Sequence, residues 1–198
     1  ARDVYKRQFL NDNQIISTKT ITSTLMNKLS LPHGTNTIKL STDTDKELFY
    51  SLAYSGFPAP PPSKPAFHGI AVTRSYTNSN GEKIKEAKLG EDVRVTLRLR
   101  SETGHDIGNV AIVDLIPAGF EIVPDSTNGY NSLEVDYYDV REDRLIIYAT
   151  VRTHSSTFEY KLHPIGRGVF TLPAVHAGSM YQLNTWGDTG VSGVIEIK

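Results

Sequence analysis

The side chains that could support acid–base or metal chemistry in this chain are its histidines, and their spacing argues against such a site. They form no HxH, HxxxH or carboxylate-paired pattern of a zinc ligand set, and they lie at His33, His68, His105, His154, His163 and His176. The chain also lacks a GxSxG elbow, a P-loop and a GxGxxG run. Its 198 residues include no cysteine, which excludes a thiol nucleophile, a thiolate metal site and a disulfide. The sequence therefore predicts no enzyme, no metal site and no cofactor.

One acidic cluster could bind calcium between loops, because carboxylates are ligands that Ca²⁺ prefers. The members of the cluster are Asp136, Asp139, Glu142 and Asp143. Two arginines, Arg141 and Arg144, are interleaved with these carboxylates and would neutralise the site. A soluble hairpin turn accounts better for the cluster than a metal site does.

The segment 174–186, AVHAGSMYQLNTW, carries large apolar groups in a stretch whose glycine, serine and asparagine content is typical of a loop. The residues concerned are Met180, Tyr181 and Trp186. Loops that expose aromatic rings and methionine tend to contact a partner. The alternative is that these side chains fill one end of a core, and the pattern alone leaves both interpretations open.

The elements that must position this segment are β-strands. Residues 93–100, VRVTLRLR, alternate between apolar and polar side chains, which predicts a half-buried strand with its odd positions facing a core. Residues 158–163 repeat the alternation. Residues 110–123 contain two apolar runs joined by a Pro-Ala-Gly corner, where proline fixes φ and glycine permits a positive φ. No amphipathic helix is indicated, so the core is predicted to form between sheets.

The predicted fold is all-β, with an antiparallel β-sandwich over residues 67–198. About nine strands with turn signals at roughly 8–12-residue spacing are typical of a sandwich. The expected strands are residues 70–77, 93–100, 110–115, 120–123, 135–140, 144–151, 157–163, 168–172 and 193–197. The residues expected in the core are Val95, Leu97, Leu99, Ile112, Leu115, Phe120, Ile147, Tyr160 and Phe170.

The part before the sandwich is expected to be a smaller and incomplete β segment over residues 1–56. Its strands are expected at 15–25, 37–40 and 48–53, with a turn at 33–36. This is too little apolar surface to fold well alone. Residues 1–8, ARDVYKRQ, resemble translated cloning sequence and are set aside as non-native or disordered. Residues 57–66 are rich in proline and predict a stiff linker between the two parts.

The composition and charge of the chain limit the classes of partner that it is expected to bind. A formal net charge of −1 does not suggest binding to nucleic acid or to an anionic membrane. No apolar run approaches the ~20 residues that cross a bilayer, and no signal-peptide pattern begins the chain. Any anchor or export signal is therefore expected outside these residues, and the absence of cysteine fits a cytoplasmic or a bacterial periplasmic protein.

Three strings in the second part carry a family resemblance: VDLIPAGFEIV, YYDVREDRLIIYATV and STFEYKLHPIGRGVFTLPAVHAGSMY. In this order they resemble the C-terminal end of bacterial alpha-2-macroglobulins, and the resemblance covers nearly all of residues 67–197. Residues 9–56, which include LFYSLAYSG, resemble the strand set that precedes that final domain and follows the thioester-bearing domain. The tail NTWGDTGVSG departs from the family, which has a more basic run there.

The resemblance implies a macroglobulin or immunoglobulin-like β-sandwich in a periplasmic protein that traps target proteases. It implies a monomeric parent, with or without a lipid anchor in the inner membrane, whose thioester domain is the partner of this module. The family's shielding loop carries a methionine in an AxSMY motif, which falls on Met180 here, with Tyr181 beside it. The resemblance therefore implies that Met180 and Tyr181 form the contact that protects the thioester from water.

A different class of function remains open. The D-x-x-P-x-G-F corner after an alternating strand also resembles sandwich repeats of bacterial surface proteins, which would make the chain an adhesin or envelope-surface module with a binding role. A second copy of the repeat upstream would favour that interpretation. The AGSMY string favours the protease-trapping module.

Overall fold

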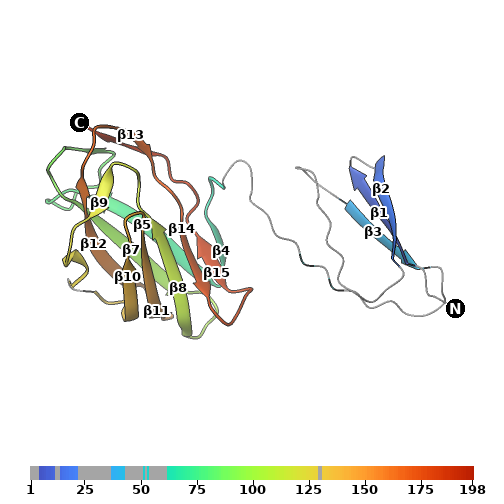
Figure 1. Ribbon diagram of the computed structural model, residues 1–198. Coiled ribbons are helices and arrows are strands. Elements are labelled where there is room, and N and C mark those ends of the chain that lie inside the picture. Colours follow the sequence, from blue (N-terminus) through green and yellow to red (C-terminus); the bar gives the residue numbers. More distant parts are fainter. Residues whose placement is uncertain are drawn as a thin grey trace. The chain divides into compact units, whose positions relative to one another are not determined.

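The computed structural model describes residues 5–11, 14–21, 37–42, 51, 53, 62–128 and 131–198. Regular structure in these ranges is β-strand apart from one 3-10 turn, η1 (Ser126–Asn128). The chain divides into two compact units, residues 1–59 and 60–198, which are described separately (Figure 1). In the described ranges no helix is long and apolar enough to span a membrane.

The first unit contains a three-stranded antiparallel sheet in the order β2-β1-β3. Its strands are β1 (Tyr5–Asn11), β2 (Gln14–Ile21) and β3 (Thr37–Thr42). Residues 5–8, which the sequence analysis set aside, belong to β1 and pair on both sides with β2 and β3. Their charged, aperiodic side chains gave no strand signal, whereas the ladder is made by the backbone. The turn expected at 33–36 and most of the strand expected at 48–53 lie outside the described residues.

The second unit is a β-sandwich, and the all-β prediction is confirmed. The larger sheet has the order β10-β11-β8-β14-β15-β4 and the facing sheet the order β5-β7-β12-β9 (Figure 1). The strands of the larger sheet are β10 (Glu134–Val140), β11 (Arg144–Val151), β8 (Ile107–Leu115), β14 (Val175–Ser179), β15 (Trp186–Asp188) and β4 (Ala66–His68). Those of the facing sheet are β5 (Ile70–Thr77), β7 (Val93–Ser101), β12 (Ser156–Pro164) and β9 (Phe120–Ile122).

A third, small sheet has the order β13-β16-β6. Its strands are β13 (Gly168–Thr171), β16 (Val194–Ile197) and β6 (Glu86–Ala87). Strands β16 and β6 are parallel, and the remaining pairs in the three sheets of this unit are antiparallel. The ring of Phe170 on β13 lies over Gly119, in the Pro-Ala-Gly corner, where an added Cβ would come within 2.5 Å of it.

The core lies between the two large sheets and follows the period-two alternation of their strands. Seven of the nine predicted core residues are buried: Val95, Leu97, Leu99, Ile112, Phe120, Ile147 and Tyr160. The other two, Leu115 and Phe170, are only partly buried, so their prediction is corrected. Leu115 lies an odd number of positions from Ile112 on β8 and so faces outward, while the inward position beside it is taken by Asp114. Phe170 packs against the core from the small sheet.

The expectation that 174–186 is a loop is correct for residues 180–185 and wrong for the two ends of the segment, which belong to β14 and β15. Strand β14 lies between β8 and β15 in the middle of the larger sheet. Its inward side chains, Val175, Ala177 and Ser179, are small and gave little hydrophobic signal. At Gly187 on β15, an added Cβ would lie 2.1 Å from the carbonyl oxygen of Ile70. The close approach of β15 to β5 therefore requires glycine there.

The sandwich begins before Phe67, the residue at which the sequence analysis placed its start. Ala66 belongs to β4, which pairs with β15, and the backbone N–H of Val191 donates to the carbonyl of Pro62 at 2.9 Å. We expect a chain of residues 60–198 to fold alone and to melt in one transition by circular dichroism. A chain starting at Phe67 should be less stable by about 1–2 kcal/mol because it lacks these contacts. A 60–198 chain that is unfolded would contradict the division into two units.

Candidate functional site

The turn between β14 and β15 presents three large apolar side chains to solvent. Met180 is 50% exposed, Tyr181 77% and Leu183 88%. They are close in sequence and lie at the tip of a hairpin whose strands are part of the larger sheet. The structure thus brings Met180 and Tyr181, the two site residues from the sequence, to one exposed turn, and it adds Leu183.

The backbone of this turn is held by hydrogen bonds. The N–H of Ser179 donates to the carbonyl of Thr185 at 2.9 Å, and that of Thr185 donates to the carbonyl of Gln182 at 2.8 Å. The N–H of Met180 donates to the carbonyl of Asn109 on β8 at 2.9 Å. The apolar side chains are therefore carried by an ordered backbone, which lowers the conformational entropy lost when a partner covers them.

A shallow groove runs beside the turn on the outer face of the hairpin. The residues that line it include Gly178, Leu183, Thr185 and Trp186. The indole of Trp186 is stacked between two imidazoles, with ring centroids 6.1 Å from His68 and 6.3 Å from His176. His68 and His176 were not predicted as site residues, because their proximity depends on the pairing of three strands.

The outer face of the larger sheet continues this surface across all six strands. One row of cross-strand neighbours consists of Tyr137, Tyr148, Ala111, Gly178, Trp186 and His68. Its two tyrosines are stacked, with centroids 6.2 Å apart. Aromatic rings thus border a centre of small side chains, which offers contact area to a partner.

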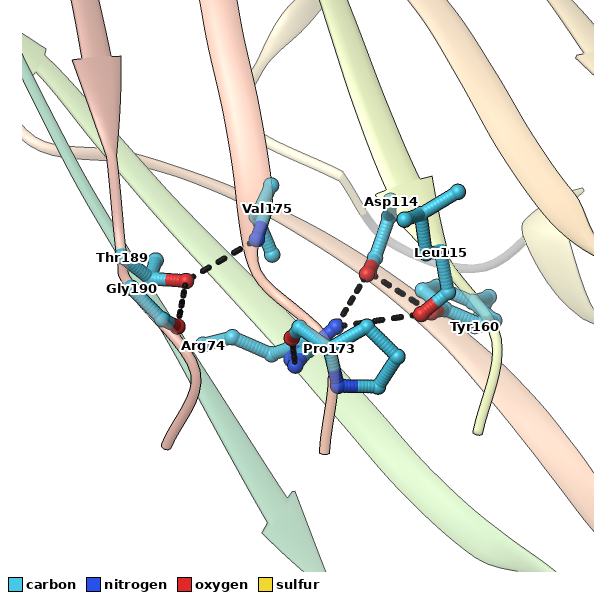
Figure 2. A network of polar contacts seen from close by, with 8 residues as sticks. All are labelled: Arg74, Asp114, Leu115, Tyr160, Pro173, Val175, Thr189 and Gly190. Carbon is cyan, nitrogen blue, oxygen red and sulfur yellow. Dashed lines mark hydrogen bonds and ion pairs between the residues drawn. The ribbon is translucent and has the colours of Figure 1, made fainter. Parts of the chain in front are cut away.

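A buried polar network lies at the other end of the hairpin (Figure 2). The carboxylate of Asp114 accepts hydrogen bonds from the guanidinium of Arg74 and, at 2.7 Å, from the hydroxyl of Tyr160. Arg74 also donates to the backbone carbonyls of Pro173 and, at 3.4 Å, of Leu115. Its guanidinium carbon lies 5.1 Å from the ring centroid of Tyr76. Burial raises the pKa of the Tyr160 hydroxyl and that of the Asp114 carboxyl.

The sequence contained one indication of this network that the sequence analysis did not use. Val110, Ile112 and Asp114 alternate on β8, and all three face inward. An acidic residue in phase with buried apolar residues calls for a buried partner. The partner, Arg74, is 40 residues away.

The other polar residues that the structure describes form no concentrated site. Among the described residues no group of three or more histidine, aspartate or glutamate side chains could hold a metal ion. In the acidic run, Asp139 pairs with Arg141 at 2.8 Å and Asp143 with Arg144 at 2.5 Å. The Arg144 hydrogen bond lowers the pKa of the Asp143 carboxyl. The arrangement can therefore bind a partner through apolar contact, and no described cluster suggests a reaction.

The fold and the exposed apolar turn define an antiparallel β-sandwich module with a surface suited to contact. Residues 69–182 match the family model described as "Bacterial Alpha-2-macroglobulin MG10 domain", which is more than half of the 198 residues. The chain belongs to this family. The match covers the strands of both large sheets from β5 to β14 and ends within the exposed turn.

Curated relatives share the similarity. The chain is 31% identical over 167 residues to an alpha-2-macroglobulin of Rickettsia conorii, covering 79% of this chain and 9% of that protein. It is 32% identical over 161 residues to an alpha-2-macroglobulin homolog of Yersinia pestis, covering 69% of this chain and 8% of that protein. The chain thus spans less than a tenth of the length of these relatives.

A solved structure shares the fold. The native conformation of E. coli alpha-2-macroglobulin matches with a TM-score of 0.63 at 16% identity, covering 98% of this chain and 13% of that one.

Proposed function

We propose that this chain is a non-catalytic structural and shielding module of a bacterial alpha-2-macroglobulin-like protein that traps proteases. In this proposal, Met180 and Tyr181 cover a thioester in another domain of the same polypeptide. The parent protein acts as a monomer in the periplasm, with or without a lipid anchor, and its further partners are the trapped proteases. The observation that carries the proposal is the exposed pair Met180 and Tyr181 on a hydrogen-bonded turn of a chain that belongs to this family.

The chemistry of the two side chains suits a lid. A thioester persists in water only when nucleophiles are kept away from it, and an apolar cover does this. A thioether beside an aromatic ring fills an irregular gap without offering a competing nucleophile at neutral pH. Covering the exposed half of Met180 contributes on the order of 1 kcal/mol. A contact of this size holds the resting state and yields when proteolysis elsewhere shifts the domains.

The test is Met180→Ala in the full-length protein, if it has a thioester. We expect more free thiol to be released by methylamine before any protease is added, because the apolar cover is smaller. The melting temperature of the 60–198 unit should stay nearly unchanged, because half of the Met180 side chain is already in solvent.

The matched control is Val169→Ala, which truncates an exposed apolar side chain on the small sheet. It should leave thiol release as in the unmodified protein. If Met180→Ala releases no more free thiol than the unmodified protein, the shielding role is wrong. A large loss of domain stability would instead make Met180 a packing residue of the sandwich.

A further inference from the structure

We infer that Arg74 and Asp114 are positioning residues that fix the register of β14 against β8 and thereby decide which way Met180 faces. The functional consequence rests on the proposed shielding role, whereas the register itself can be measured without it. The inference concerns residues at the root of the hairpin, beside Val175, the first residue of β14 (Figure 2).

The contacts of Arg74 place it as a bridge between the two sheets. It lies on β5 of the four-stranded sheet, and its side chain is 2% exposed. Its guanidinium reaches Asp114 on β8 and the carbonyl of Pro173, two residues before β14 begins. Asp114 is in turn the cross-strand neighbour of Val175, the first residue of β14. One side chain therefore holds both β8 and the entry to β14.

The residues that follow β15 are hydrogen-bonded to the first residue of β14. The hydroxyl of Thr189 accepts from the N–H of Val175 at 2.9 Å and donates to the carbonyl of Gly190 at 3.1 Å. The N–H of Thr189 donates to the carbonyl of Val175 at 3.1 Å. Figure 2 shows the two bonds of the Thr189 hydroxyl together with the Arg74–Asp114 pair. The start of β14 and the residues after β15 thus form one polar junction.

The side chains of β14 define its register poorly. Its inward positions are Val175, Ala177 and Ser179, and its outward positions are His176 and Gly178. Apart from Val175 and His176 these side chains are small, so they distinguish one register from the next only weakly, and a slip of one residue turns every side chain to the other face. Such a slip would turn Met180 from solvent toward the core.

Stability alone is a weak reason for this buried ion pair. Replacing a buried pair by apolar residues is often neutral, because desolvation offsets the attraction. The hydrogen bonds of the Arg74 guanidinium, in contrast, are directional. They form only when the carbonyl of Pro173 and the carboxylate of Asp114 lie at one relative position. The pair therefore supplies the register information that the β14 side chains lack.

The test is amide hydrogen exchange on the full chain in Asp114→Asn and in the double variant Arg74→Met/Asp114→Leu. The double variant removes both charges, so no unpaired charge remains in the core. Relative to amides of β7 and β12, those of residues 175–179 and 186–188 should exchange roughly tenfold faster or more in both variants. Acrylamide quenching of Trp186, the single tryptophan, should increase in parallel.

The control is Arg152→Met, which breaks two exposed ion pairs, with Asp106 at 3.0 Å and with Glu134 at 2.5 Å. It should leave exchange of the hairpin unchanged. Exchange that rises uniformly over both sheets would overturn the positioning role. The same holds if the hairpin of the double variant exchanges at the rate of the unmodified chain. Failure of the Met180→Ala thiol test would remove the shielding function and leave this result standing.

Discussion

Asp114→Ala is expected to lower the free energy of unfolding by about 3–5 kcal/mol, because removing one partner of a buried ion pair leaves the other charge uncompensated. The Asp114 side chain is 0% exposed and that of Arg74 is 2% exposed, so water cannot replace the lost carboxylate. The hydroxyl of Tyr160 would lose its hydrogen-bond acceptor as well. Burial disfavours the charged guanidinium, but Asp114 together with Tyr76 and Tyr160 outweighs this effect in the unmodified chain, and the pKa of Arg74 is raised. A guanidinium keeps its proton in proteins, so Asp114→Ala leaves a buried charge without its counter-ion.

The measurement is urea unfolding of the full chain and of the 60–198 unit, with the m-value compared between variants. Arg74→Met/Asp114→Leu should lose clearly less free energy of unfolding than Arg74→Met and Asp114→Leu lose in sum when each is made alone, because the double variant leaves no buried charge unpaired. Arg152→Met should change stability by at most about 1 kcal/mol, because its ion pairs are exposed. A loss below about 1 kcal/mol in Asp114→Ala would show that the pair is accessible to water in solution.

Leu97→Ala is expected to cost roughly 2–5 kcal/mol of stability, the range for deleting a fully buried leucine side chain. Leu97 lies at the centre of β7 and is 0% exposed. Its cross-strand neighbours are Phe158 on β12 and Arg74 on β5, so β7 is paired on both sides and has limited freedom to close the cavity. Urea unfolding of the 60–198 unit measures the effect.

The matched control for this prediction is Leu183→Ala, which removes the same atoms from a side chain that is 88% exposed. It should change stability by about 0.5 kcal/mol or less. Equal losses in the two variants would mean that β7 does not present its odd positions to the core. The register of the four-stranded sheet would then be wrong.

The strands whose alternation is strong could be predicted from sequence, and those built from small residues could not. Residues 70–77 and 144–151 form β5 and β11 with the expected bounds, because each has apolar residues on the inward face. Strand β14 was missed because alanine and serine face its core, and β15 was missed because its inward residue is Gly187. For these two strands, backbone pairing with neighbours replaces the side-chain signal.

The candidate site divides in the same way. The composition of the turn left open whether Met180 and Tyr181 are exposed or fill one end of the core, and the structure places both in solvent. The stack of Trp186 with His68 and His176 depends on registers between β4, β15 and β14 that no local pattern encodes. Pairing of Arg74 with Asp114 depends on the contact between two sheets. Long-range pairing, not side-chain type, is the information that the sequence pattern lacks.

The position of β4 at the edge of the larger sheet has a mechanical consequence. A tension applied through the chain before residue 62 would load the Val191–Pro62 hydrogen bond and then the three cross-strand pairs between β4 and β15. A three-residue edge strand can peel away while the core between the two large sheets stays intact. Peeling would uncover the edge of β15 and the stacked ring of Trp186. Under such tension the pairing between β4 and β15 should therefore break first, and the β14–β15 hairpin should be disturbed before the core is.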